Sequence, residues 1–153
     1  MDIIPAHSPD HLVAVRNLFV EYAENLGVDL CFQGFQQELD GLPGDYAPPD
    51  GRLLLAVDGD RPAGCVAIRK LGEGICEMKR LYVKPGNRGQ GLGRRLAEAV
   101  IAEAGTIGYK KMRLDSLTSL KEAATLYRSL GFVEIPPYRY NPLPEAVFME
   151  LRL

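Results

Sequence analysis

The stretch "LYVKPGNRGQGLG", residues 81–93, decides how this chain folds. It joins the end of an apolar run to a glycine-rich loop, and the segment that follows, 91–105, has apolar residues at helical spacing. The next segment, 110–117, has the pattern of a strand. A strand, a helix and a second strand in this order predict a parallel strand pair joined by a crossover.

Upstream of this stretch, three strand patterns follow one another, and Asp58 and Gly59 form a hairpin signal between the first two. An antiparallel meander followed by a parallel crossover predicts an α/β fold with a mixed central β-sheet and flanking helices. We expect strands at 52–57, 62–68, 75–83, 110–117, 132–135 and 146–153, and helices at 8–27, 33–39, 91–105 and 119–131.

Local signals mark the ends of several of these elements. Ser8 suits the N-cap of the first helix, and Gly27 can end it. Ser119 and Glu122 have the spacing of a capping box at the last helix. In the strand 75–83, alternation predicts that residues 77, 79, 81 and 83 share one face.

Composition narrows the class of protein. The 153 residues fit a single domain spanning 1–153. With 18 basic and 20 acidic residues the formal net charge is −2, which argues against a general nucleic-acid binder. No apolar run approaches a membrane span, and the first residues lack the pattern of a signal peptide.

The residues that bind metals or form disulfides are sparse. The three cysteines, Cys31, Cys65 and Cys76, are far apart and odd in number, which favours reduced thiols in a cytoplasm over a disulfide framework. His7 and His11 stand four apart without a third ligand nearby, so we expect no metal site.

Glycines between a strand and a helix can bind phosphate, because bare backbone amides meet the positive end of the helix dipole there. A P-loop would need Lys and Ser or Thr where this chain has Leu92 and Gly93. A dinucleotide-binding loop would need a third glycine where Arg94 stands, although Asp115 lies about where its ribose-binding acid is expected.

A third pattern, R-x-x-G-x-G, is formed by Arg88, Gly91 and Gly93. Together with the preceding "LYV" it resembles the acyl-CoA loop of the GCN5-related N-acetyltransferase (GNAT) family. Further downstream, "A..LY...GF" matches a helix of the same family, and the order of elements matches over nearly the whole chain. The matching residues of that helix and its end are Ala123, Leu126, Tyr127, Gly131 and Phe132.

The resemblance implies an enzyme that binds acetyl-CoA as cosubstrate, without a metal. Loop amides would wrap the pyrophosphate, and the backbone of the preceding strand would pair with the pantetheine arm like a missing strand, which requires the next parallel strand to splay away. The implied cofactor-binding residues are Leu81, Tyr82, Val83, Arg88, Gly89, Gln90, Gly91, Leu92, Gly93 and Arg94. Many members carry Asn where this chain has Leu120, so a polar contact there falls to Thr118 or Ser119 or is absent.

The resemblance also implies two catalytic residues. Tyr127 matches the tyrosine that protonates the departing thiolate, although its helical face also suits a core residue. Glu77 matches a carboxylate that takes the proton of the attacking amine, directly or through water; an ion pair with Lys79 or Arg80 is the alternative.

The acceptor is expected to contact the segment 28–51 and the loop 136–144, where aromatic and acidic side chains suited to a cationic amine gather. Phe32, Phe35 and Tyr138 are the substrate-binding candidates. A small amine or amino-acid-like acceptor is expected, with a protein amine as the alternative. A non-catalytic acyl-CoA sensor and a nicotinamide-nucleotide protein are the other functions considered. The family resemblance also leaves a homodimer open.

Overall fold

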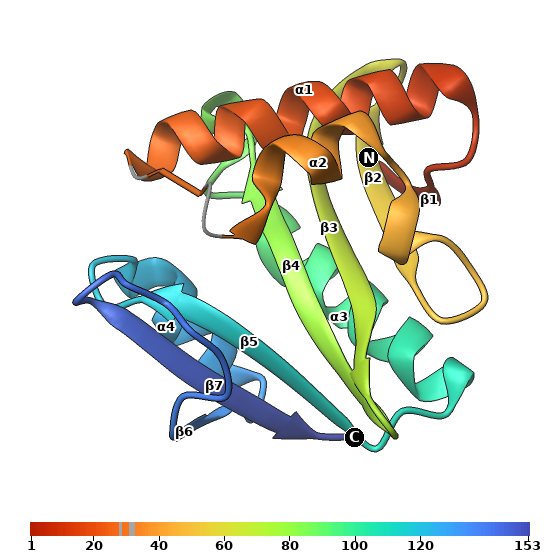
Figure 1. Cartoon of the computed structure of the whole chain (residues 1–153). Helices are drawn as coiled ribbons and strands as arrows, with labels where there is room; N and C mark the ends of the chain where they lie inside the picture. The colour runs from red at the N-terminus through yellow and green to blue at the C-terminus, as the bar shows by residue number, and fades with distance from the viewer. Residues whose placement is uncertain (28, 31–32) are drawn as a thin grey trace.

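The structure is a computed structural model that describes residues 1–27, 29–30 and 33–153. Its described strands form one mixed sheet in the order β1-β2-β3-β4-β5-β7-β6 (Figure 1). Only β4 and β5 pair in parallel, and every other neighbouring pair is antiparallel. The strands are β1 (Asp2–Pro5), β2 (Arg52–Asp58), β3 (Arg61–Gly72), β4 (Ile75–Val83), β5 (Lys111–Leu117), β6 (Val133–Ile135) and β7 (Ala146–Arg152).

Helices cover both faces of the sheet. In Figure 1, α1 and α2 lie on one face of β2 to β4, and α3 lies on the other. The described helices are α1 (Pro9–Leu26), α2 (Phe35–Asp40), α3 (Leu92–Ile107) and α4 (Lys121–Ser129), with the short 3-10 helices η2 (Gly44–Tyr46) and η3 (Pro85–Asn87). The predicted α/β fold with a mixed sheet and flanking helices is confirmed.

The parallel pair separates soon after it forms. Only residues 75–77 of β4 pair with residues 111–113 of β5, and beyond them the strands diverge into a V (Figure 1). The rest of β4, from Met78 to Val83, therefore has no strand partner on its β5 side. This is the splay that strand-like pairing with an extended ligand requires.

Local signals explain how the helices begin and end. The amide of His11 donates to the Ser8 hydroxyl at 3.2 Å, and Gly27 ends α1 in the left-handed conformation, as predicted. The capping box at the last helix was a wrong prediction. A turn from Leu117 to Leu120 precedes α4, which begins at Lys121 and has Leu120, without a side-chain hydrogen bond, as its N-cap.

Alternation along β4 is broken at Arg80, the only described non-glycine residue with a positive φ, 60°. The pairing with β3 shifts here, so that Cys65 faces Tyr82 while Ala67 faces Lys79. Such a bulge moves later side chains to the opposite face. The prediction that residues 77, 79, 81 and 83 share a face is therefore wrong: Leu81 and Val83 pack into the α3-side core with Met78, and Tyr82 belongs to the core under α1.

The N-terminal strand β1 was not predicted. Its four residues pair with residues 54–57 of β2 at the edge of the sheet, and so short a run carries little periodic signal. Cys65 and Cys76 are buried free thiols, and Cys31 lies outside the described residues. No helix in the described part of the chain is long and apolar enough to cross a membrane.

Candidate active site

A groove of about 640 Å³ runs between β4, the glycine loop and the start of α4. Of the predicted cofactor-binding residues, it is lined by Leu81, Tyr82, Val83, Arg88, Gly89, Gly91, Leu92 and Gly93. Gln90 and Arg94 are not part of this lining, and Arg94 instead donates a hydrogen bond to the hydroxyl of Ser129.

The glycine loop presents unpaired backbone donors to this groove. Gly89 and Gly91 adopt positive φ angles of 79° and 77°, which glycine adopts without strain. None of the described residues accepts a hydrogen bond from the backbone amides of residues 89–93. Helix α3 begins here, and its first turn contains no acidic residue. Backbone donors without protein acceptors at the start of a helix suit a phosphate group, because the positive end of the helix dipole lies there.

Arg88 marks the junction of the loop and β4. Its Nε donates to the carbonyl oxygen of Val83 at 2.9 Å, and its guanidinium lies 5.7 Å from the centroid of the Tyr82 ring. The hydroxyl of Tyr82 in turn donates to Glu21 of α1 at 3.2 Å. These contacts hold the end of β4 against α1 beside the groove.

Next to the groove lies a smaller pocket of about 80 Å³, inside the V between β4 and β5. Tyr127 of α4, Lys79 of β4 and Asp115 of β5 line the pocket. The two spaces are adjacent, because five residues line both of them: Tyr22, Leu26, Leu81, Leu120 and Ala123.

Tyr127 presents a protonated phenol to this pocket. Its side chain is buried, and its ring packs edge-on against Phe132 at 5.7 Å between centroids. Burial raises the pKa of Tyr127, so the hydroxyl keeps its proton at neutral pH. Within the described residues this hydroxyl has no hydrogen-bond partner, so it is available to a ligand.

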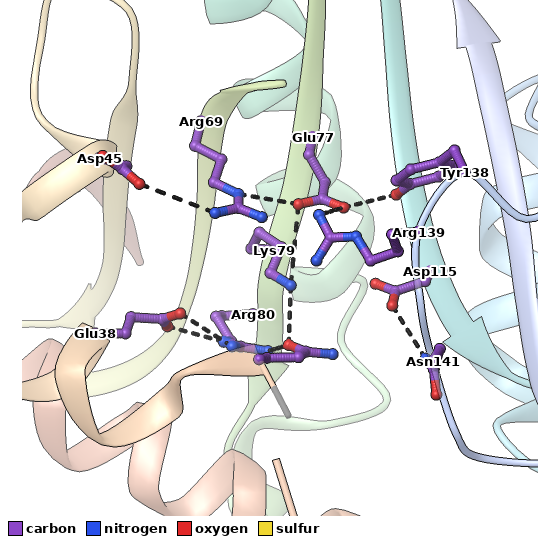
Figure 2. A network of polar contacts seen from close by, with 11 residues as sticks. Glu38, Asp45, Arg69, Glu77, Lys79, Arg80, Asp115, Tyr138, Arg139 and Asn141 are labelled. Carbon is purple, nitrogen blue, oxygen red and sulfur yellow. Dashed lines mark hydrogen bonds and ion pairs between the residues drawn. The ribbon is translucent and has the colours of Figure 1, made fainter. Parts of the chain in front are cut away.

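Glu77 does not line the pocket, and Figure 2 shows it at the centre of a polar network. Its fully buried carboxylate accepts hydrogen bonds from Arg69 at 3.0 Å, from the hydroxyl of Tyr138 at 2.6 Å, and from Arg139. Burial alone would raise the pKa of Glu77, but Lys79 and Arg139, with the hydrogen bond from Tyr138, lower it below its usual value. The carboxylate of Glu77 is therefore ionised, and its oxygens already accept hydrogen bonds from three side chains of the protein.

The model of the acetyltransferase (GNAT) domain matches residues 49–134. The chain belongs to the GNAT acetyltransferase family. A curated N-acetyltransferase of Schizosaccharomyces pombe is 42% identical over 147 residues, which cover 95% of this chain and 90% of that protein. These matches identify the chain as an N-acetyltransferase and exclude the nicotinamide-nucleotide protein as its class.

Solved structures share the fold. A GNAT acetyltransferase from Staphylococcus aureus superposes with a TM-score of 0.82 at 19% identity, covering 99% of this chain and 98% of that one. A putative acetyltransferase from Salmonella typhimurium, solved with its cofactor acetyl-CoA, has a TM-score of 0.69 at 22% identity and covers 99% and 93%. At sequence identities this low, the similarity to these two structures shows a shared fold alone.

Two of the aromatic candidates for acceptor binding in this GNAT chain, Phe35 and Tyr138, are not part of the pocket lining. Phe32 lies outside the described residues. Phe35 packs under the guanidinium of Arg80 at 5.1 Å, and Tyr138 donates to Glu77, so neither lines the pocket. Acids of the same region pair with the protein's own arginines: Glu38 with Arg80, Asp40 with Arg16, and Asp45 with Arg69.

Sequence reasoning missed Lys79 and Asp115 as pocket residues. The sequence indicates Lys79 only as an ion-pair partner and Asp115 only as a ribose-binding acid. The available signal was the group of charged residues Glu77, Lys79 and Arg80 inside a predicted strand, since buried charges need a reason. Burial, with the nearby Arg80, lowers the pKa of Lys79 to about 8. No group of three metal-ligating side chains occurs among the described residues.

Proposed function

We propose that this GNAT enzyme transfers the acetyl group of acetyl-CoA to the primary amine of a small molecule or amino-acid-like acceptor, by direct attack of the amine on the thioester. The observation that carries this proposal is that the glycine-loop groove adjoins the pocket lined by Tyr127, with five lining residues in common. Acetyl-CoA supplies the activated acetyl thioester.

The chain's own residues would hold the cosubstrate at both ends of the groove. Open backbone amides at Gly89 and Gly91, with Arg88 beside them, suit the pyrophosphate. The edge of β4 after Glu77 has no strand partner on its β5 side among the described residues, and it suits the amide-containing pantetheine arm. A side chain missed in the sequence, Lys121, also lines the groove and adds positive charge.

In the transfer, the acceptor must first lose one proton from its ammonium form, and the neutral amine then attacks the thioester carbonyl carbon. The carbon–sulfur bond breaks, Tyr127 would donate its proton to the departing sulfur, and the proton that the new amide nitrogen loses would restore the phenol, directly or through water. As the recipient of the first proton, Glu77 stays a prediction. Because its pKa is lowered and three donors engage it, the geometry favours Asp115, which lines the pocket, as the proton's recipient.

The pocket also supports a small acceptor. Its volume of about 80 Å³, against about 640 Å³ for the groove, suits a compact amine better than a folded protein surface. The sensor alternative lacks such an argument, because a sensor needs no protonated phenol in the pocket beside the groove. Residues 1–153 are proposed to act as one domain. A cytoplasmic location and a homodimer stay predictions.

A thiol-release assay with acetyl-CoA and a panel of small amines tests the proposal. We expect amine-dependent release of CoA and a rise in melting temperature with acetyl-CoA but not with NADH. Binding of acetyl-CoA without release of CoA for any amine or peptide would overturn the catalytic role and leave the sensor.

A further inference from the structure

A polar network lies beside the pocket, with three cations around the carboxylate of Glu77: Arg69 at 3.0 Å, Lys79 at 4.0 Å, and Arg139 (Figure 2). Arg69 also pairs with Asp45 at 3.9 Å, and Arg80 pairs separately with Glu38 at 2.9 Å. Of the three cations around Glu77, Lys79 is the most deeply buried, and it shares that carboxylate with two arginines. A buried ammonium with so distant and shared a counter-charge is costly, so an anion beside Lys79 would be stabilised.

Lys79 is the cation of this network that reaches the pocket. Its side chain is only 4% exposed, and it comes from the strand that forms one wall of the V. Its ammonium donates one hydrogen bond, to the amide oxygen of Gln33 at 2.9 Å, and it stands beyond hydrogen-bond distance from Glu77. An ammonium has three donors, so two are available to a ligand.

A second observation comes from Arg139, on the loop before β7. One of its terminal nitrogens donates to Glu77, but its Nε is buried and has no hydrogen-bond partner within the described part of the chain. Buried donors are nearly always paired in folded proteins. Arg139 does not line the pocket, so this unpaired donor shows only that the network behind Lys79 is incompletely satisfied.

The opposite wall of the pocket carries the opposite charge. Asp115 of β5 lines the pocket, and its carboxylate accepts one hydrogen bond, from Asn141 at 3.2 Å. Lys79 and Asp115 influence each other electrostatically, yet no ion pair within 4.0 Å joins them. The pocket therefore holds an ammonium on one wall and a carboxylate on the other.

We propose that the acceptor is a free amino acid, whose carboxylate is bound by Lys79 and whose amino group lies at Asp115. The inference rests on the proposed acetyl transfer and deepens it. A zwitterion satisfies both walls of the pocket at once, whereas a simple amine leaves the remaining donors of Lys79 without a partner. In a peptide, the carboxylate next to the N-terminal amino group is replaced by an uncharged amide carbonyl, which would not pair with the ammonium of Lys79.

Matched acceptors test this without altering the protein. For each of several amino acids, the free acid is compared with its carboxamide and with the amine lacking the carboxyl group, such as alanine, alaninamide and ethylamine. Charge-assisted hydrogen bonds predict a kcat/KM about 10- to 100-fold higher for the free acid. Equal rates for the three, or a preference for a peptide with a free N-terminus, would overturn the proposal.

Variants of Lys79 assign the binding residue. Lys79→Met removes the charge and should abolish the preference for the free acid mainly by raising its KM, and Lys79→Arg should restore much of it. Persistence of the preference in a folded Lys79→Met protein would show that Lys79 does not bind the carboxylate. If acetyl-CoA binds but neither amines nor amino acids release CoA, the proposed function itself fails, which is a different result.

Discussion

The guanidinium of Arg80 donates two hydrogen bonds to the carboxylate of Glu38, at 2.9 and 3.0 Å, and so ties the bulge of β4 to α2. The Arg80 side chain is 2% exposed and also donates to Gln33 at 2.8 Å. Its backbone has a φ of 60°, which costs a non-glycine residue about 1–3 kcal/mol. The ion pair between Arg80 and Glu38 offsets part of this conformational cost.

Breaking this pair should destabilise the protein. Glu38→Gln leaves a buried guanidinium without its counter-charge, and we expect the free energy of unfolding to fall by about 3 kcal/mol. Urea denaturation measures it. Asp40→Asn is the matched control on the same helix, because its 3.7 Å pair with Arg16 is exposed and should contribute less than about 1 kcal/mol. Equal losses in the two variants would contradict a structural role for the buried pair.

Tyr127→Phe should lower kcat about 100-fold or more while leaving the affinity for acetyl-CoA unchanged, because only the proton donor is lost. Steady-state thiol release and calorimetric binding measure the two quantities. Tyr109→Phe is the control: it removes the hydroxyl bond from Tyr109 to the Asp50 carbonyl oxygen, away from the pocket, and should leave kcat unaltered. A wild-type kcat in Tyr127→Phe would remove the phenol from the mechanism.

Gly91→Ala should weaken acetyl-CoA binding about tenfold. A Cβ at Gly91 would meet no atom within 4 Å, so the expected cost comes from its φ of 77°, about 1–2 kcal/mol for a residue with a side chain. Relief of that strain would turn the loop amides away from the groove. Gly105→Ala in the body of α3 also has open space and no positive φ, and should bind acetyl-CoA normally. Unaltered binding by Gly91→Ala would argue against the loop as the phosphate site.

Inhibition by an N-acetylated amino acid should weaken at alkaline pH. This product keeps the carboxylate and has no amine to titrate. Burial, then Arg80, lowers the pKa of Lys79 to about 8, whereas Glu77 and Asp115 oppose the shift and Arg139 adds to it. The anion binds the charged ammonium, so affinity is full below the pKa and is lost above it. We expect the inhibition constant to rise about tenfold from pH 7 to pH 9.

Lys79→Arg is the control for this pH effect, because arginine stays charged over the whole range. Its inhibition constant should change little between the two pH values. A rise of the same size in this variant would assign the titration to another group.

Glu77 and Asp115 can be separated as proton acceptors. Glu77→Gln removes the carboxylate shared by three cations and should cost about 3 kcal/mol of stability. Asp115→Asn should retain stability but lower kcat about 100-fold. Urea denaturation measures the stability of the two variants, and initial rates measure their kcat. If Glu77→Gln is as stable as the parent and loses kcat, Glu77 is the base after all.

The sequence by itself determined the order of the elements from α1 onward, the glycine loop and the family. These rest on local signals: apolar spacing, the caps at Ser8 and Gly27, and the pattern of Arg88, Gly91 and Gly93. Helical and strand periodicity acts over a few residues, so it can be read without knowing the partners. The short edge strand β1 and the start of α4 escaped because their local signals were weak or misleading.

Only the tertiary structure decided the candidate acceptor pocket. The bulge at Arg80 changes which β4 residues share a face, and it arises from the register with β3. The splay after residue 77 opens the V, and β5 then carries Asp115 to the wall opposite Lys79. These residues are 36 positions apart in sequence, and strand pairing alone brings them to one pocket. Pairing between distant strands leaves no periodic trace in either segment, so the charges that favour an amino acid were visible only after folding.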